Sequence, residues 1–135
     1  MAMETTLILV KPDGVQRGLV GEVVQRIERK GLQLVGLKMM LPPRSLLEQH
    51  YAVHADKPFY ESLLAFMSSG PVVAIAARGD GAIDTMRTVM GPTDGRKASP
   101  GTIRGDFGMG FSYNIVHGSD GEDTAKSDSP SGSPA

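Results

Sequence analysis

The chain has no cysteine, no long apolar run and little net charge, and each lack excludes a class of protein. Without cysteine it cannot form disulfides or thiolate metal sites. No apolar run approaches the length of a transmembrane helix, and the N-terminus lacks the basic and apolar segments of a secretory signal. A net charge of −1 gives no attraction of the whole chain to nucleic acid or to an anionic membrane. We therefore predict a soluble cytoplasmic protein that binds any phosphate through a local group of basic residues.

Histidine is also scarce, since the chain has only His50, His54 and His117. His50 and His54 are four residues apart and could share one helix face. No acidic residue stands at a spacing that would complete a metal site with them. We interpret both as surface histidines and predict that the protein itself holds no metal.

A length of 135 residues, of which 40% are hydrophobic, fits one globular domain. The composition changes at Gly121, after which serine, aspartate, proline and glycine dominate. Such a segment cannot bury enough apolar surface to offset the entropy lost on ordering. We predict a folded domain over residues 1–120 and a flexible tail over residues 121–135.

Hydrophobic periodicity predicts strands that alternate with helices. We expect strands at 5–10, 33–41, 71–77 and 111–117, and helices at 21–30, 45–51, 58–67 and 81–90. Pro12, Asp13 and Gly14 are interpreted as a turn that ends the first strand. Ser45 and Glu48 have the spacing of a capping box, and the helix from residue 58 is expected to start at its proline. Residues 91–110 are rich in glycine and proline and are predicted to form a long functional loop.

This order of elements favours an α+β fold of the ferredoxin-like βαββαβ type. In that fold a four-stranded antiparallel sheet is covered by helices, and the long loop would come just before the last strand. A flavodoxin-like parallel sheet is the alternative, but it normally needs a fifth strand.

The stretch from Asn114 to Asp120 holds the best candidate for chemistry. Ile115 and Val116 are typical of the end of a buried strand, so His117 would lie where that strand leaves the core. Gly118 leaves the imidazole uncrowded, and a largely neutral imidazole near pH 7 has a lone pair for nucleophilic attack. The alternative is a core histidine bonded to backbone, which is the usual role of a single histidine.

Basic residues elsewhere favour the nucleophile. Lys11 directly follows the first strand, Arg87 lies on a predicted helix, and Thr93 and Arg104 lie in the long loop. Arginine can bind phosphate oxygens through two parallel hydrogen bonds, and together these side chains could neutralise a polyphosphate. The Gly91–Lys97 segment lacks the spacing of a Walker A loop. Phe59 is either a core aromatic or a stacking surface for a nucleobase.

Several segments together resemble the nucleoside diphosphate kinase family. They are Lys11-Pro12-Asp13-Gly14-Val15-Gln16-Arg17, Lys57-Pro58-Phe59, Gly70-Pro71-Val72, Pro100-Gly101-Thr102-Ile103-Arg104-Gly105-Asp106-Phe107 and Asn114-Ile115-Val116-His117-Gly118-Ser119-Asp120. The resemblance runs from about residue 4 to about residue 120, and the combination in this order is highly specific.

The resemblance implies a ferredoxin-like fold and a ping-pong reaction through phosphohistidine at Nδ1 of His117. It implies that Lys11 contacts the sugar hydroxyl and the transferring phosphate, with Tyr51 beside it, and that Asn114 binds the 3′-hydroxyl. Phe59 would stack on the base, while Arg87, Thr93 and Arg104 would hold the phosphates. Mg²⁺ would be carried by the nucleotide, and the chain would form a homo-oligomer, a tetramer or a hexamer.

The chain departs from the family pattern in three places. Phe111 replaces a smaller residue that commonly forms the other side of the base slot. Where the family usually has a glutamate that orients the histidine, this chain has Asp128, so Asp128, Glu122 or a water could supply that bond. Ser119 keeps its family position, but the usual apolar C-terminal segment is replaced by the tail.

Two other functions are compatible with the same predicted fold. RNA-recognition domains use the same order of elements, but they need aromatic residues on their central strands, and the first three predicted strands have none. A catalytically weakened nucleotide-binding regulator of the same fold is the other alternative, because of Asp128 and the altered tail.

Overall fold

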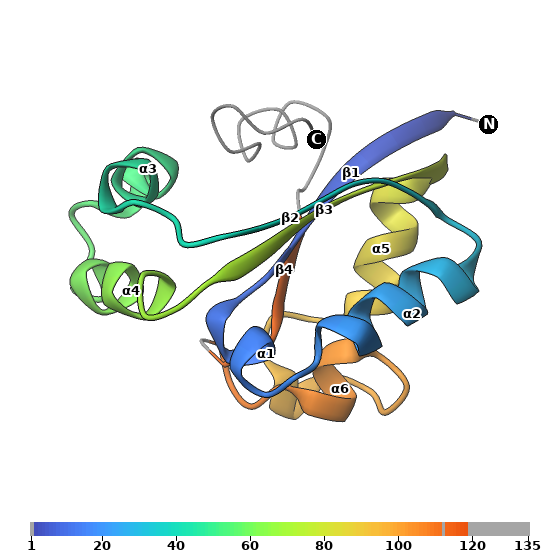
Figure 1. Ribbon diagram of the computed structural model, residues 1–135. Helices are drawn as coiled ribbons and strands as arrows, with labels where there is room; N and C mark the ends of the chain where they lie inside the picture. The colour runs from blue at the N-terminus through green and yellow to red at the C-terminus, as the bar shows by residue number, and fades with distance from the viewer. Residues whose placement is uncertain (1, 112, 119–135) are drawn as a thin grey trace.

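The computed structural model describes residues 2–111 and 113–118. Four strands form one sheet of order β2-β3-β1-β4, in which every neighbouring pair is antiparallel (Figure 1). The strands are β1 (Met3–Val10), β2 (Gln33–Met40), β3 (Val72–Asp80) and β4 (Val116–Gly118). This arrangement confirms the predicted ferredoxin-like sheet and excludes the parallel alternative.

Helices join the strands and lie mainly against one face of the sheet. They are α1 (Pro12–Gln16), α2 (Val20–Lys30), α3 (Arg44–His50), η1 (Ala52–His54), α4 (Tyr60–Met67), α5 (Ala82–Met90), η2 (Gly95–Lys97) and α6 (Ile103–Phe107). In Figure 1, α2, α5 and α6 lie on one side of the sheet, whereas α3 and α4 stand together at one end. The protein therefore has a main body and a short helical arm.

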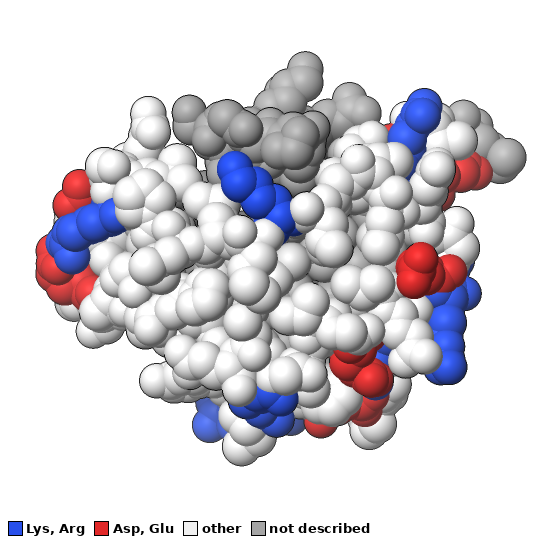
Figure 2. All heavy atoms as spheres, in the orientation of Figure 1, with Lys and Arg blue, Asp and Glu red and all other residues white. Residues whose placement is uncertain are grey.

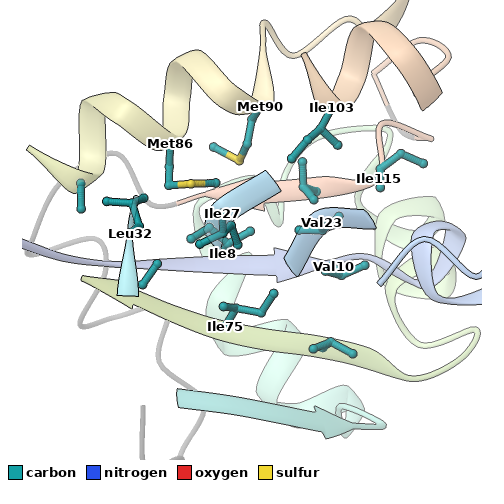
Figure 3. Close-up of a cluster of buried hydrophobic side chains, with 14 residues drawn as sticks. Ile8, Val10, Val23, Ile27, Leu32, Ile75, Met86, Met90, Ile103 and Ile115 are labelled. Atoms are coloured by element: carbon teal, nitrogen blue, oxygen red, sulfur yellow. The ribbon is translucent and has the colours of Figure 1, made fainter. Parts of the chain in front are cut away.

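The main core forms between the sheet and the α2–α5 layer. Ile8 and Ile75 point from the sheet toward Val23 and Ile27 of α2, and Met86 of α5 closes the cluster (Figure 3). Val23 and Ile27 are four residues apart and fully buried, which explains why this sequence forms an amphipathic helix. A smaller cluster joins α3 and α4 to the sheet through Leu47, Leu64, Met67 and Val72.

Several predicted boundaries were wrong. Pro12, Asp13 and Gly14 do not form a turn but begin helix α1, because proline is well suited to the first helical position. The predicted capping box is absent: α3 begins at Arg44 after Pro43, and Glu48 bonds to Arg44 Nε at 3.0 Å instead. The next helix, α4, begins at Tyr60, two residues later than predicted.

The C-terminal part of the described chain also differs from the prediction. The last strand covers only Val116–Gly118, and residues 113–115 approach it outside any named strand. The predicted loop over residues 91–110 contains two short helices, η2 and α6. Thr102 caps α6 by accepting a hydrogen bond from Gly105 N at 2.9 Å, so this segment is ordered by its own side chains.

The described surface gives two further facts. No helix within residues 2–111 and 113–118 has the length and apolar character that spanning a membrane requires. Basic and acidic side chains lie in small separate groups on the face shown in Figure 2, with a broad uncharged area between them.

Candidate active site

His117 lies in the short edge strand β4, where it pairs with Leu9 of β1. The side chain is half-buried and therefore not a core histidine sealed from solvent. His117 was predicted as the last residue of a strand over residues 111–117; it does lie in the strand, but it is the central residue of β4, which begins at Val116 and extends to Gly118. A Cβ on Gly118 would also meet the flexible end of the Met90 side chain.

A pocket of about 570 Å³ opens in front of this strand. His117 lines it together with Arg87 from α5, Thr93 from the following segment and Arg104 from α6. Four of the predicted site residues therefore meet in one cavity, although up to thirty positions separate them in the chain. No carboxylate is among its lining residues within the described chain, so the pocket suits an anion.

Arg104 is held rigidly in the wall of this pocket. It is buried, and it donates from Nη1 to Gly91 O and from Nη2 to Val116 O, both at 2.8 Å. Burial lowers the pKa of its guanidinium, and its Nε has no hydrogen-bond partner in the described part of the chain. A guanidinium has five N–H donors, so three are left after these two bonds, and one of the three is the buried Nε–H. Arg87, in contrast, is exposed.

Lys11 and Asn114 form a buried pair beside the pocket. Lys11 Nζ donates to Asn114 Oδ1 at 2.7 Å, and Asn114 Nδ2 donates to Thr93 O at 2.9 Å. The pair therefore reaches the pocket wall through Thr93, although neither residue is part of the lining. Burial lowers the pKa of the Lys11 ammonium from 10.5 to about 8, while the Asp13 carboxylate raises it and the Arg104 guanidinium lowers it further.

Two predicted site residues lie farther from the cavity. Phe59 precedes α4, is 48% exposed and contacts His54 with ring centroids 5.6 Å apart. Tyr51 packs edge-on against His50 at 4.5 Å. Neither lines the pocket within the described structure. Phe59 is an exposed aromatic directly before α4, so the core-aromatic interpretation is wrong.

His50 is a neighbour of the site that the sequence did not reveal. Its ring lies 6.0 Å from the ring of His117, in an edge-on arrangement, and it links His117 to Tyr51. The sequence indicated only a surface histidine, whereas the structure shows His50 half-buried and in contact with His117. Its position next to Tyr51 was the available signal, but the distance to His117 depends on how α3 folds back on the sheet.

Ser119, Glu122 and Asp128 lie outside the described residues, as does the whole predicted tail. Phe111 is described and exposed. Among residues 2–111 and 113–118, no three histidine or acidic side chains gather closely enough to hold a metal ion.

The arrangement can support transfer of an anionic group to a nitrogen nucleophile. A half-buried imidazole faces a cavity with a fixed guanidinium and a second, exposed guanidinium. Positive groups fixed before reaction stabilise developing negative charge without reorganisation. The hydroxyl-bearing Thr93 adds a donor at the same wall.

Comparison with known proteins connects this geometry to a family. The family model described as nucleoside diphosphate kinase matches residues 4–130. The nucleoside diphosphate kinase of Microcystis aeruginosa is 56% identical over 124 residues, which are 92% of this chain and 83% of the relative. That of Prochlorococcus marinus is 53% identical over 125 residues, covering 93% and 83%.

Solved structures agree. A nucleoside diphosphate kinase from Halobacterium salinarum in complex with CDP superposes with a TM-score of 0.86 at 51% identity, covering 90% of this chain and 80% of that one. A nucleoside diphosphate kinase family protein from Babesia bovis gives 0.87 at 46% identity, covering 91% and 83%. The chain belongs to the nucleoside diphosphate kinase family and is a phosphotransferase that acts on nucleotides.

Proposed function

We propose that His117 carries the phosphoryl group between the two half-reactions of a nucleoside diphosphate kinase. The imidazole Nδ1 lone pair attacks the γ-phosphorus of a nucleoside triphosphate, and the bond to the β–γ bridging oxygen breaks. The diphosphate leaves with that electron pair. A terminal oxygen of a second nucleoside diphosphate then attacks the phosphohistidine and breaks its P–N bond, which restores His117.

One observation carries this proposal: His117 shares a single cavity with Arg87, Thr93 and Arg104. We assign these three side chains to the phosphates. Arg104 is suited to the transferring phosphate because two backbone carbonyls fix its orientation before substrate binds. Arg87 is exposed and lines the same cavity, so it suits the phosphates of an entering nucleotide.

Lys11 and Asn114 are assigned to the boundary between phosphate and sugar. Their hydrogen bond of 2.7 Å brings an ammonium and an amide together next to Thr93. The ammonium would neutralise the transferring phosphate, and the amide would bind the sugar 3′-hydroxyl. Tyr51 would support this region through His50.

Phe59 is proposed as the stacking surface for the base. Its exposure at the start of α4 supports this assignment, since a ring with a free face can stack on any base. Phe111 is exposed as well and would form the other side of the slot. Stacking without base-specific hydrogen bonds would give the enzyme a broad nucleotide preference.

Kinases of this type generally need a divalent cation, and we propose Mg²⁺. The described pocket lining has no carboxylate to hold it, which fits an ion that the nucleotide phosphates carry. When bound, the ion would neutralise part of the phosphate charge. We also propose that His117 is supported by Ser119 and oriented by a hydrogen bond to Asp128, Glu122 or a water.

We also propose a homo-oligomer, a tetramer or hexamer. Strand β2 is at the edge of the sheet, and Val35, Leu37 and Met39 on it, with Leu41 after it, are exposed. An apolar row on an open edge is a typical interface between protein chains.

Four earlier expectations stay predictions. They are the domain boundary at residue 120, the flexible tail after it, a cytoplasmic location, and the lack of membrane or nucleic-acid partners.

The direct test incubates the protein with ATP and GDP. We expect GTP to form, together with protein-bound phosphate that is labile in acid and stable in base. His117→Ala should abolish both while ADP still binds, and His54→Ala, as the matched control, should keep the phosphate label. Unchanged GTP formation by His117→Ala would refute the assignment. Nucleotide binding without labelling of the wild type would indicate the weakened regulator instead.

A further inference from the structure

Ile115, two residues before His117, has an unusual backbone conformation. Its φ is +74°, and it is the only non-glycine residue with positive φ in the described chain. Val116 N donates to Asn114 O at 2.8 Å across it, which defines a γ-turn of the rare form with positive φ. For a β-branched residue this is a true outlier, and such strain persists only where neighbouring groups enforce it.

The beginning of α1 supplies the groups that hold this turn. Ile115 N donates to Asp13 Oδ2 at 3.1 Å, and Ile115 O accepts from Lys11 N at 2.8 Å. The backbone N–H and C=O of Ile115 are therefore both bound by residues 11–13, which lie more than a hundred positions earlier in the chain. Asp13 is only 7% exposed, and its Oδ1 has no hydrogen-bond partner in the described structure.

Packing leaves the turn little room to relax. The Ile115 side chain is fully buried and lies near Ile103 in the main core (Figure 3). On the other side, a Cβ on Gly14 would lie 3.0 Å from Ile115 Cγ2 and 3.2 Å from Ile115 O. Glycine at position 14 thus lets α1 approach closely enough for Asp13 to reach the turn.

The turn determines where the flanking site residues point. On one side Asn114 binds Lys11 and the backbone of Thr93. On the other, Val116 O accepts the hydrogen bond that fixes Arg104, and His117 comes next. If Ile115 relaxed to a negative φ, the direction of the chain between Asn114 and His117 would change, and their common orientation toward the pocket would be lost.

We propose that Asp13 is a positioning residue for phosphoryl transfer, because its carboxylate holds the strained Ile115 turn in the conformation that presents His117 to the pocket. This inference rests on the proposed role of His117. The competing explanation is that Asp13 acts only as a counter-charge for Lys11, whose ammonium also faces the Arg104 guanidinium, the Asn114 amide and the Phe66 ring.

The two explanations separate in a comparison of Asp13→Ala with Asp13→Asn. Both variants remove the charge, but the asparagine side chain still offers an oxygen to Ile115 N. We would measure the single-turnover rate of His117 phosphorylation by ATP, the affinity for ADP, and the pH profile of the rate. The exposed Asp80, replaced by alanine, is the matched control.

We expect Asp13→Ala to slow phosphorylation roughly 10- to 100-fold at neutral pH, with ADP affinity changed by less than about threefold. Asp13→Asn should stay within about fivefold of wild type at neutral pH, since it keeps the acceptor. In both variants the alkaline limb of the profile should move to lower pH, because Lys11 loses a stabilising charge. The Asp80→Ala control should match wild type in every measurement.

Equal rates for Asp13→Ala and wild type would overturn the inference, and so would an Asp13→Asn rate as low as that of Asp13→Ala. If Asp13→Ala does not fold, Asp13→Glu replaces it: the charge remains but the acceptor is displaced by a methylene group. If Asp13 is a positioning residue, His117 should be phosphorylated slowly in Asp13→Glu and fast in Asp13→Asn. The reverse order of these two rates would refute that role. Absence of phosphate on wild-type His117 would instead refute the proposed function.

Discussion

Lys11 should make the stability of the protein depend on pH, and Lys11→Met should remove that dependence. Lys11 is 7% exposed, and burial is the main cause that lowers its pKa from 10.5 to about 8. Below pH 8 the folded and the unfolded chain both hold the proton. Between pH 8 and pH 10.5 the folded state has lost it while the unfolded state still binds it, so the free energy of unfolding rises with pH in this window.

The size of the effect follows from the shift. A change from 10.5 to about 8 corresponds to about 3 kcal/mol across the whole window, at about 1.4 kcal/mol per pKa unit. Between pH 7 and pH 9 only part of this gain in the free energy of unfolding is reached, about 1 kcal/mol. Methionine has a similar length and no charge, so the variant should lack this contribution at every pH.

Urea unfolding followed by circular dichroism measures the effect. Wild type and Lys11→Met are compared at pH 7 and pH 9, at one protein concentration, because an oligomer's stability depends on concentration. Titration of other groups cancels in the difference between the two proteins. Wild type should gain about 1 kcal/mol more than the variant between the two pH values. An equal pH dependence in both proteins would show that the Lys11 ammonium is not desolvated as described.

Three further predictions concern the base, the α6 segment and the sheet edge. Phe59→Ala should raise KM for GDP and CDP alike by roughly 10- to 100-fold with little change in kcat, as steady-state kinetics would show; an effect on one base only would contradict simple stacking. Arg26→Met removes hydrogen bonds to Asp106 Oδ2 at 2.7 Å and Gly101 O at 3.3 Å, and should lower the free energy of unfolding in urea by about 1 kcal/mol. Leu37→Lys should shift the protein to smaller species in light scattering while His117 is still phosphorylated; an unchanged mass would place the interface elsewhere.

Much of the fold follows from local sequence pattern. The helix over residues 20–30 was predictable because apolar residues recur on one face and Gly31 ends it, where a φ of +100° suits glycine. The boundaries that failed depend on competition between local signals. At α3 the Ser45–Glu48 pattern predicted a capping box, but Glu48 instead accepts a hydrogen bond from Arg44. The same guanidinium also binds Glu61 and so joins α3 to α4.

The sequence predicted which residues form the site but not the contacts that hold them in place. Residue types and the family resemblance singled out His117, Arg87 and Arg104, which the structure brings into one cavity. The hydrogen bond between Lys11 and Asn114, the contact of His50 with His117 and the turn at Ile115 all depend on tertiary packing. A positive φ at isoleucine contradicts local preference, so no sequence pattern could indicate it.

The central claim is that His117 carries the phosphoryl group, and mapping the phosphate tests it most directly. The protein would be mixed briefly with ATP, kept at basic pH, digested and analysed by mass spectrometry, with a parallel sample chased with GDP. We predict one phosphate, on His117, which GDP removes as GTP forms. Phosphate on another residue, or GTP formed while His117 stays unmodified at every time point, would contradict the account.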